Sequence, residues 1–328
     1  MTDVIIIAIL AAVLIAAARY VYRAKKNHAP CIGCSACHGH AKKREPIPAA
    51  AAADTPTNKR NRLRAATPRP GALHAIQKGT LSMLLEVCVD SYESAKIAAE
   101  HGADRLELCA NLLIGGTSPS PFLIEAVQSL GVPVRVLLRP RFGDFLYTPM
   151  ELELLRREVE SCRSLGVDGV VLGVLTADGR LDREALAALL DAAGPLHKTL
   201  HRAFDVCRDP FEGLEDAVAL GFDTILTSGQ RATALEGADL LRQLHTAAAG
   251  RITLMAGSGV NLQTLPRLLA ETPLNAFHLS AKTTVDSPMV FRREGVPMGL
   301  PMAGEYERFY ADGAVIAQVK ALLCRSFS

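Results

Sequence analysis

The sequence predicts an α/β protein whose body, residues 83–328, is a (β/α)8 TIM-type barrel, preceded by one N-terminal transmembrane helix and a disordered linker. Eight short runs, mostly rich in Val, Ile and Leu, lie in this body, and helix-sized segments separate seven of them from the next. Eight alternating units in about 245 residues favour a closed barrel over an open doubly wound sheet. The first run is not followed by three spaced glycines, so we predict no nucleotide cofactor.

The elements of this barrel can be placed in chain order. The predicted strands are MLLEVCV from residue 83, RLELC from 105, VRVLLRP from 134, GVVLGVL from 169, HKTLHRAF from 197, DTILTSG from 223, ITLMAGSG from 252 and AFHLSA from 276. The predicted helices begin at Ser91, after Pro119, at Pro149, near Asp182 and after Pro210, and the last one runs through AVIAQVKALL from residue 314.

Charge is distributed unevenly along the chain. Residues 1–82 carry 13 Lys and Arg against 3 Asp and Glu, and residues 83–328 carry 23 against 31, so +10 and −8 make the total of +2. An acidic body argues against nucleic acid as a partner, because phosphate binding requires a clustered basic face. For the basic residues 1–82, a membrane is a better explanation than nucleic acid.

Residues 1–26 are predicted to be a transmembrane anchor with a basic flank. The stretch 4–22 is apolar apart from Arg19, and its 19 residues are close to the roughly 20 that span a bilayer as a helix. Basic residues follow this stretch and none precedes it, which predicts a cytoplasmic barrel tethered to the membrane. A cleaved signal peptide is the alternative, but it would need a basic start that is missing here.

Two further segments separate the anchor from the barrel. Residues 27–40 are rich in Cys and His, and Cys31, Cys34 and Cys37 offer soft ligands for Cu(I), zinc or an iron–sulfur species. A Cys/His-rich tail without a bound metal is the alternative. Residues 41–82 mix Ala, Pro, Thr and basic residues without an apolar period, so we predict a disordered linker.

Two similar pairs of residues mark the candidate site. Glu86 precedes Cys88 by two positions in the first predicted strand, and Glu107 precedes Cys109 by two in the second. Side chains at i and i+2 lie on one side of a strand, so both pairs are expected to converge at the barrel centre. Thiolates bind soft metal ions, and a barrel-facing carboxylate needs a partner or a function.

Other polar residues stand where later strands end, which is the catalytic face of such barrels. Arg139 is expected either to neutralise the two glutamates or to hold a substrate carboxylate or phosphate. His201, with Asp205 nearby, is a candidate general acid or base. The candidates for binding an anion through the last loops are Ser228, Gly229, Gly257, Ser258 and His278. The alternative to an anion site is that the glycines of these loops only form tight turns.

From Met83 to about Cys324 the chain resembles the copper homeostasis protein CutC family, through EVCVDS, GADRLELC, GGTSPS, RPRFGDFLY, HRAFD, LTSGQ and FHLSA in that order. The resemblance implies a single TIM-type barrel, usually cytoplasmic and dimeric, associated with copper tolerance and Cu(I) binding. It also implies that Cys88 and Cys109 bind the copper ion. About 45 N-terminal residues resemble the FeoB-associated cysteine-rich membrane proteins linked to ferrous iron uptake. If translation starts at Met83, the barrel alone is cytoplasmic.

Three functional hypotheses follow. The first is a membrane-tethered barrel that binds Cu(I) in copper homeostasis. The second is a barrel enzyme for a small anionic substrate, with Arg139 as the anion clamp and the acid and base groups drawn from Glu86, Glu107, His201 and Asp205. The third is a dimeric structural partner whose N-terminal cysteine tail is the metal module.

Overall fold

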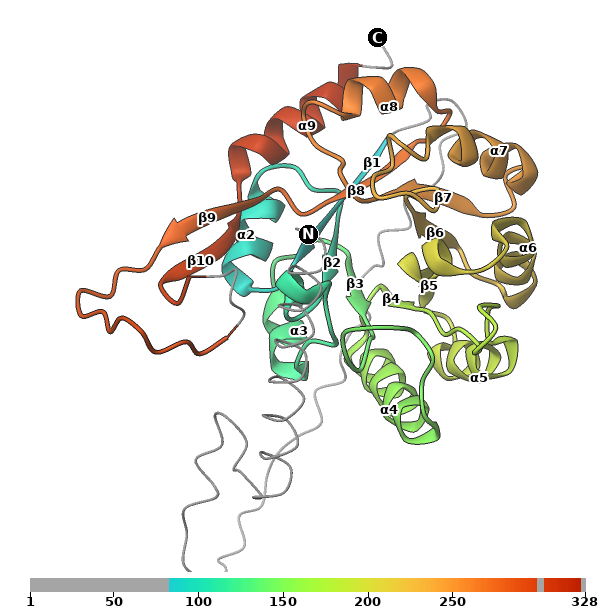
Figure 1. The fold of residues 1–328 in the computed structure, drawn as a ribbon, viewed down its shortest axis with the longest axis horizontal. Coiled ribbons are helices and arrows are strands. Elements are labelled where there is room, and N and C mark those ends of the chain that lie inside the picture. Colours follow the sequence, from blue (N-terminus) through green and yellow to red (C-terminus); the bar gives the residue numbers. More distant parts are fainter. Residues whose placement is uncertain (1–82, 300–303, 326–328) are drawn as a thin grey trace, which may run out of the picture. The chain divides into compact units, whose positions relative to one another are not determined.

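The computed structural model describes residues 83–299 and 304–325, and it confirms the predicted barrel (Figure 1). Eight parallel strands close on themselves, since each strand pairs with the next and the last pairs with the first. The strands are β1 Leu84–Val89, β2 Arg105–Leu108, β3 Val134–Leu137, β4 Gly169–Leu172, β5 His197–Leu200, β6 Thr224–Thr227, β7 Thr253–Ala256 and β8 Ala276–Leu279. The predicted anchor, Cys/His-rich segment and linker lie outside the described residues. Among the described helices, none has the length and apolar character needed to span a bilayer.

Helices surround the barrel, and most begin where the sequence predicts (Figure 1). Ser91 caps the first described helix by accepting a hydrogen bond from the Ser94 amide, and Thr148 forms a capping box with Glu151 ahead of Pro149. The α-helices are α2 Tyr92–Glu100, α3 Pro121–Gln128, α4 Pro149–Leu165, α5 Arg183–Ala193, α6 Pro210–Leu220, α7 Ala238–Ala248, α8 Leu265–Glu271 and α9 Gly313–Arg325. Two 3-10 helices, η2 Leu112–Ile114 and η3 Arg202–Val206, follow β2 and β5.

Successive side chains of each strand point to opposite sides of the sheet, which divides the buried residues into two regions. In β1, Leu85 and Val87 belong to the large apolar core, whereas Glu86 and Cys88 do not. This core lies between the strands and the helices, as expected for parallel strands that are covered on their outer face. The barrel interior has only small apolar clusters, which are Cys109, Leu137 and Val171 at one place and Leu226, Met255 and Ala276 at another. The remaining interior positions can therefore hold polar side chains.

The register of the strands brings the polar residues together. Cys88 lies opposite Glu107 in the β1–β2 pair, and Glu86 lies opposite Arg105 there. On the other side of β1, Glu86 lies opposite His278 of β8. Residues that are 192 positions apart in the sequence thus become neighbours.

An antiparallel ribbon follows the barrel and was not predicted. It consists of β9 Lys282–Asp286 and β10 Glu307–Ala311, and it projects beside α2 (Figure 1). The Ala311 amide donates to the Ser94 hydroxyl of α2 at 3.2 Å. The sequence KTTVD is mostly exposed and has no apolar alternation, so its β-branched residues were the only local signal for a strand.

Candidate functional site

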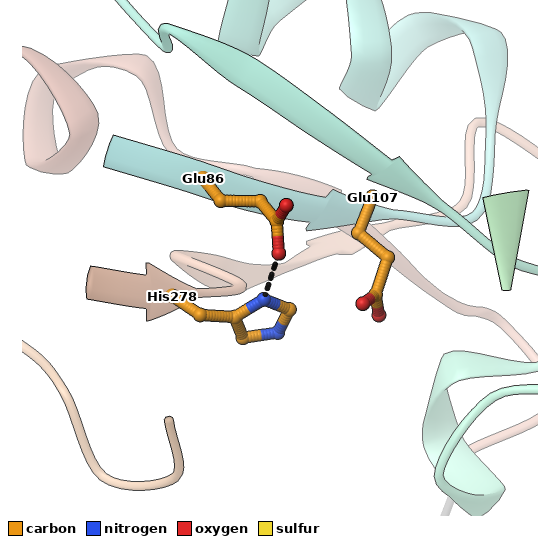
Figure 2. Close-up of side chains that lie close together, drawn as sticks. All are labelled: Glu86, Glu107 and His278. Atoms are coloured by element: carbon orange, nitrogen blue, oxygen red, sulfur yellow. Dashed lines mark hydrogen bonds and ion pairs between the residues drawn. The ribbon is translucent and has the colours of Figure 1, made fainter. Parts of the chain in front are cut away.

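A buried ionic cluster connects β1, β2 and β8. One oxygen of Glu86 accepts a hydrogen bond from the Arg105 Nε at 2.5 Å, and the other lies 2.8 Å from the His278 Nδ1. Figure 2 shows the Glu107 carboxylate beside the His278 ring, next to the edge that contacts Glu86. Ligand atoms of Glu86, Glu107 and His278 all lie within 4.8 Å of one another. All three side chains are buried, so their charges act in a medium of low polarity.

Their surroundings shift the pKa values in opposite directions. Burial raises the pKa of Glu86, but the Arg105 charge and the His278 hydrogen bond outweigh burial and hold this pKa at about 2. Burial lowers the pKa of His278, but the neighbouring Cys88 and Glu107 raise it well above its usual value. Burial raises the pKa of Glu107 to about 7, although the His278 charge opposes the rise. Glu86 is therefore ionised at neutral pH, while Glu107 has one carboxylate oxygen, Oε2, without a described hydrogen-bond partner.

The structure brings the two predicted thiols together at one cavity, at the C-terminal ends of the barrel strands. Cys88 and Cys109 are both buried, and both line this cavity together with Glu107 and His278. The Cys109 thiol donates to the Val89 carbonyl at 3.5 Å. Burial raises the pKa of this thiol, and the negative groups around it raise the pKa further. A thiolate at Cys109 therefore needs a compensating positive charge nearby.

This cavity of about 330 Å³ lies at the C-terminal ends of the strands, where the barrel prediction placed the site. Besides the residues already named, its polar lining consists of Arg139, His201, Arg202 and Asp205, and its apolar lining includes Leu137, Phe145 and Leu226. Three buried polar atoms on these lining residues have no described partner, and they are Glu107 Oε2, His201 Nε2 and Arg139 Nε. Buried polar groups in proteins are normally hydrogen-bonded, so unpartnered groups of this kind indicate a place for a ligand or water.

His201 is held in one orientation at the start of η3. Its Nδ1 accepts a hydrogen bond from the Ala203 amide at 3.1 Å, so the proton of the neutral ring is on Nε2. Burial lowers its pKa to about 3, and the Arg139 charge contributes to this shift. A Cβ at Gly173 would lie 2.6 Å from the His201 ring, so glycine is needed for the ring to pack here. His201 is thus a neutral hydrogen-bond donor at the cavity.

The expectation that Arg139 neutralises the two glutamates is wrong, because Arg105 and His278 pair with Glu86 instead. The Arg139 guanidinium donates to the backbone carbonyls of Gly115, Gly116 and Gly143 at 3.1, 3.4 and 2.7 Å. It also lies over the Phe145 ring, 4.9 Å from its centroid. Sequence reasoning missed Arg105, although its position two residues before Glu107 indicates the same inward side of the strand.

In the loops after β6 and β7, the amides of Ser228, Gly229 and Gly257 donate to groups of the protein itself. The Ser228 amide donates to the Asp205 carboxylate at 2.9 Å, and the Gly229 amide donates to the Thr227 hydroxyl. The Gly257 amide donates to the Thr227 carbonyl, and the Ser258 hydroxyl donates to the Ala232 carbonyl. In the described structure, Ser228, Gly229, Gly257 and Ser258 are not among the residues that line the cavity. Gly229 has a φ of +67°, which fits the tight-turn alternative.

Asp205 lines the cavity, but its carboxylate is surrounded by donors of the protein itself. It accepts from the Thr227 hydroxyl at 2.6 Å and from the Arg202 Nε at 2.6 Å, in addition to the Ser228 amide. Both oxygens of this carboxylate already accept hydrogen bonds from the protein, so little of it is left to contact a substrate. Its geometry instead orients Arg202.

Comparisons with known proteins agree with this architecture. The model of the CutC family matches residues 83–283, and the model of the FeoB-associated Cys-rich membrane proteins matches residues 2–42. The copper homeostasis protein cutC homolog of Homo sapiens is 43% identical over 241 residues, which are 73% of this chain and 88% of the relative. A CutC protein from Porphyromonas gingivalis is 42% identical over 245 residues, covering 74% of this chain and 99% of that protein. The crystal structure of a CutC protein from Streptococcus agalactiae matches with a TM-score of 0.58 at 32% identity, over 60% of this chain and 98% of that one.

Proposed function

The chain belongs to the CutC family, and from this we propose that its barrel acts in copper homeostasis by binding Cu(I) through Cys88 and Cys109. The names of the mammalian relatives support the role in copper homeostasis. The observation that carries the proposed ligands is the convergence of two buried thiols on one cavity, one from β1 and one from the residue that follows β2.

The chemistry of this donor set suits a soft cation. Two thiolates are sufficient for Cu(I), which accepts nearly linear coordination by sulfur. Asp90 and Glu107 raise the pKa of Cys109 beyond the effect of burial and the neighbouring Cys88, so they oppose an uncompensated thiolate there. The same negative groups favour a bound cation. Metal binding would therefore release a proton from Cys109.

We expect the Cys88→Ser/Cys109→Ser variant to lose Cu(I) affinity by at least about tenfold, which corresponds to 1.4 kcal/mol. The measurement is competition of the reduced full chain against a chromophoric Cu(I) chelator. All variants carry Cys31→Ser, Cys34→Ser and Cys37→Ser, so that the N-terminal tail cannot bind the ion.

Cys162→Ser in the same background is the matched control, because Cys162 is also a buried cysteine but lies on α4. It should bind Cu(I) as tightly as its parent. Equal affinity of the double variant and its parent would contradict the proposed ligands. Copper bound only when the tail cysteines are present would favour the third hypothesis, in which the tail is the metal module and the barrel is a dimeric partner. The homodimer itself is a proposal that follows from the family resemblance.

We further propose that residues 4–22 tether the barrel to the cytoplasmic side of a membrane. The support is the match of a membrane-protein family model to residues 2–42, together with the basic flank after the apolar stretch. A pair of reporters, each active on one side of the membrane, would be fused after Ser328. We expect only the cytoplasmic reporter to be active, and activity of the other one would refute this topology.

A second candidate function is catalysis on a small anionic molecule. The specific observation in its favour is the set of unpartnered buried atoms of Glu107, His201 and Arg139 at one cavity, which a carrier that uses two thiolates does not need. Of the four predicted catalytic residues, Glu86 is paired with Arg105, and Asp205 is paired with Arg202. Glu107 and His201 are therefore the groups left to contact a substrate.

A further inference from the structure

We propose that Arg202, rather than Arg139, binds the anionic group of a small ligand in the cavity, and that the His201 Nε2–H donates to an uncharged oxygen of the same ligand. The inference rests on the second candidate function and names its recognition residues and ligand class. The ligand would be a small carboxylate or phosphate ester that carries a carbonyl or hydroxyl oxygen near its anionic group.

Arg202 is held in place for such a role. Its Nε donates to Asp205 at 2.6 Å, and its Nη2 donates to the Ser228 hydroxyl at 3.0 Å. Its Nη1 makes no hydrogen bond to the described residues, and the residue lines the cavity with a side chain that is 42% exposed. A guanidinium that is oriented by a buried carboxylate loses little further freedom when it binds an anion.

Asp205 positions Arg202 because it is itself fixed. The Thr227 hydroxyl and the Ser228 amide both donate to its carboxylate, and Thr227 and Ser228 are fully buried at the end of β6. The position of the Arg202 guanidinium is thus fixed by buried groups at the C-terminal end of β6. Binding sites supported in this way are more rigid than sites on loops alone.

Arg139 is a weaker candidate for the same task. Its Nη1 and Nη2 are both used by backbone carbonyls of Gly115, Gly116 and Gly143. Three of its five N–H donors are used in this way, whereas Arg202 uses two of its five, so Arg202 has more donors left for the bidentate contact that favours arginine for carboxylates and phosphates. Arg139 instead connects the loop after β2 to the loop after β3.

His201 and Glu107 define the rest of the ligand. His201 is 5% exposed, and its Nε2–H has no described partner, which is unfavourable unless a ligand or water accepts the bond. Because Nδ1 is occupied by the Ala203 amide, Nε2 can only donate, and a carbonyl or hydroxyl oxygen is its natural acceptor. Glu107 Oε2 is unpartnered as well and can accept from a ligand hydroxyl. A cavity of about 330 Å³ is at the small end of ligand pockets, so it suits a small metabolite.

The test measures binding of two named probes to the full chain by calorimetry. Lactate presents a carboxylate beside a hydroxyl, and glycerol 3-phosphate presents a phosphate with hydroxyls, so the comparison shows which anion is preferred. We expect at least one probe to bind the wild type, and Arg202→Gln to weaken its binding at least about tenfold. His201→Phe keeps a ring but removes the donor, and it should weaken binding of the same probe severalfold.

Arg208→Gln is the matched control. Arg208 has the same side-chain exposure of 42% and also forms ion pairs, with Asp178 and Glu212, but it does not line the cavity. Its replacement should change the affinity less than twofold. Circular dichroism checks that each variant is folded. If Arg202→Gln unfolds, Arg202→Lys replaces it, because lysine keeps the positive charge but lacks the paired N–H donors of the guanidinium.

The outcomes separate this inference from the function on which it rests. If a probe binds and Arg202→Gln binds it as well as Arg208→Gln does, the inference is overturned while the second candidate function stands. If Arg139→Gln alone abolishes binding, the clamp is Arg139 and the inference is equally overturned. If neither probe binds the wild type at tens of millimolar, both the inference and the second candidate function are refuted for carboxylates and phosphates.

Discussion

Replacing Arg105 with Met should lower the free energy of unfolding by about 3 kcal/mol, because it removes one of the two cations that contact the Glu86 carboxylate in the barrel interior. Glu86 is 0% exposed, and the Arg105 Nε lies 2.5 Å from its carboxylate. Breaking a buried ion pair typically costs about 3–5 kcal/mol. We expect the lower end of this range, since His278 still contacts the other oxygen of Glu86. Urea denaturation followed by circular dichroism measures the change.

An exposed pair provides the control for this prediction. Arg251 also forms short contacts with a glutamate, Glu215, but the two side chains are 41% and 59% exposed to solvent. Arg251→Met should leave the free energy of unfolding almost unchanged, because water solvates the remaining carboxylate. Similar losses in Arg105→Met and Arg251→Met would show that burial of Glu86 does not decide the strength of the pair. Arg105→Lys, which restores the charge, should recover part of the lost stability.

Replacing Asp205 with Ala should destabilise the barrel by at least about 3 kcal/mol, because several buried donors lose their acceptor together. The buried donors are the Ser228 amide, the Ser228 hydroxyl and the Thr227 hydroxyl, and the partly exposed Arg202 guanidinium donates to this carboxylate as well. Each buried donor without a partner costs about 1–3 kcal/mol. Asp205→Asn keeps an acceptor oxygen for Thr227 and Ser228, so it should lose less stability than Asp205→Ala. The midpoint and slope of urea unfolding give both values.

Asp209 is the matched residue for this second prediction, since it also accepts hydrogen bonds but stands at the exposed start of α6. Its carboxylate caps that helix by accepting from the Phe211 and Glu212 amides. Loss of such a cap costs about 1 kcal/mol, because water can solvate the freed amides. Asp209→Ala should therefore be clearly less harmful than Asp205→Ala. If both substitutions had the same effect, the buried hydrogen bonds of Asp205 could not be the cause of its importance.

Much of the candidate site follows from local patterns. The inward side of β1 and β2 could be predicted, because Glu86 and Cys88, like Glu107 and Cys109, are two residues apart. The starts of α2 and α4 could be predicted as well, and the structure shows the caps at Ser91 and Thr148 that define them. In contrast, β9 and β10 pair only with each other among the described strands, and neither carries the run of buried Val, Ile and Leu that marks the barrel strands, so they were not recognised.

The roles of the charged residues could not be predicted in the same way. Arg139 and Arg202 both follow strands and look equivalent in the sequence, yet the first binds backbone carbonyls and the second is oriented by Asp205. Ser228 was expected to offer its amide to an anion, but a carboxylate of the same chain occupies that position. These assignments depend on which loops meet above the barrel.

The sequence by itself determined that this chain contains a (β/α)8 barrel and that two Glu–Cys pairs face its interior, because strand alternation is a local property of the backbone. Only the tertiary structure decided that Glu86 pairs with Arg105 and His278, while Glu107 has an unpartnered oxygen. The physical reason is that barrel closure sets the register of β8 on β1 and the depth of each side chain. Depth and neighbouring charge together determine the pKa, so two similar glutamates acquire pKa values of about 2 and about 7.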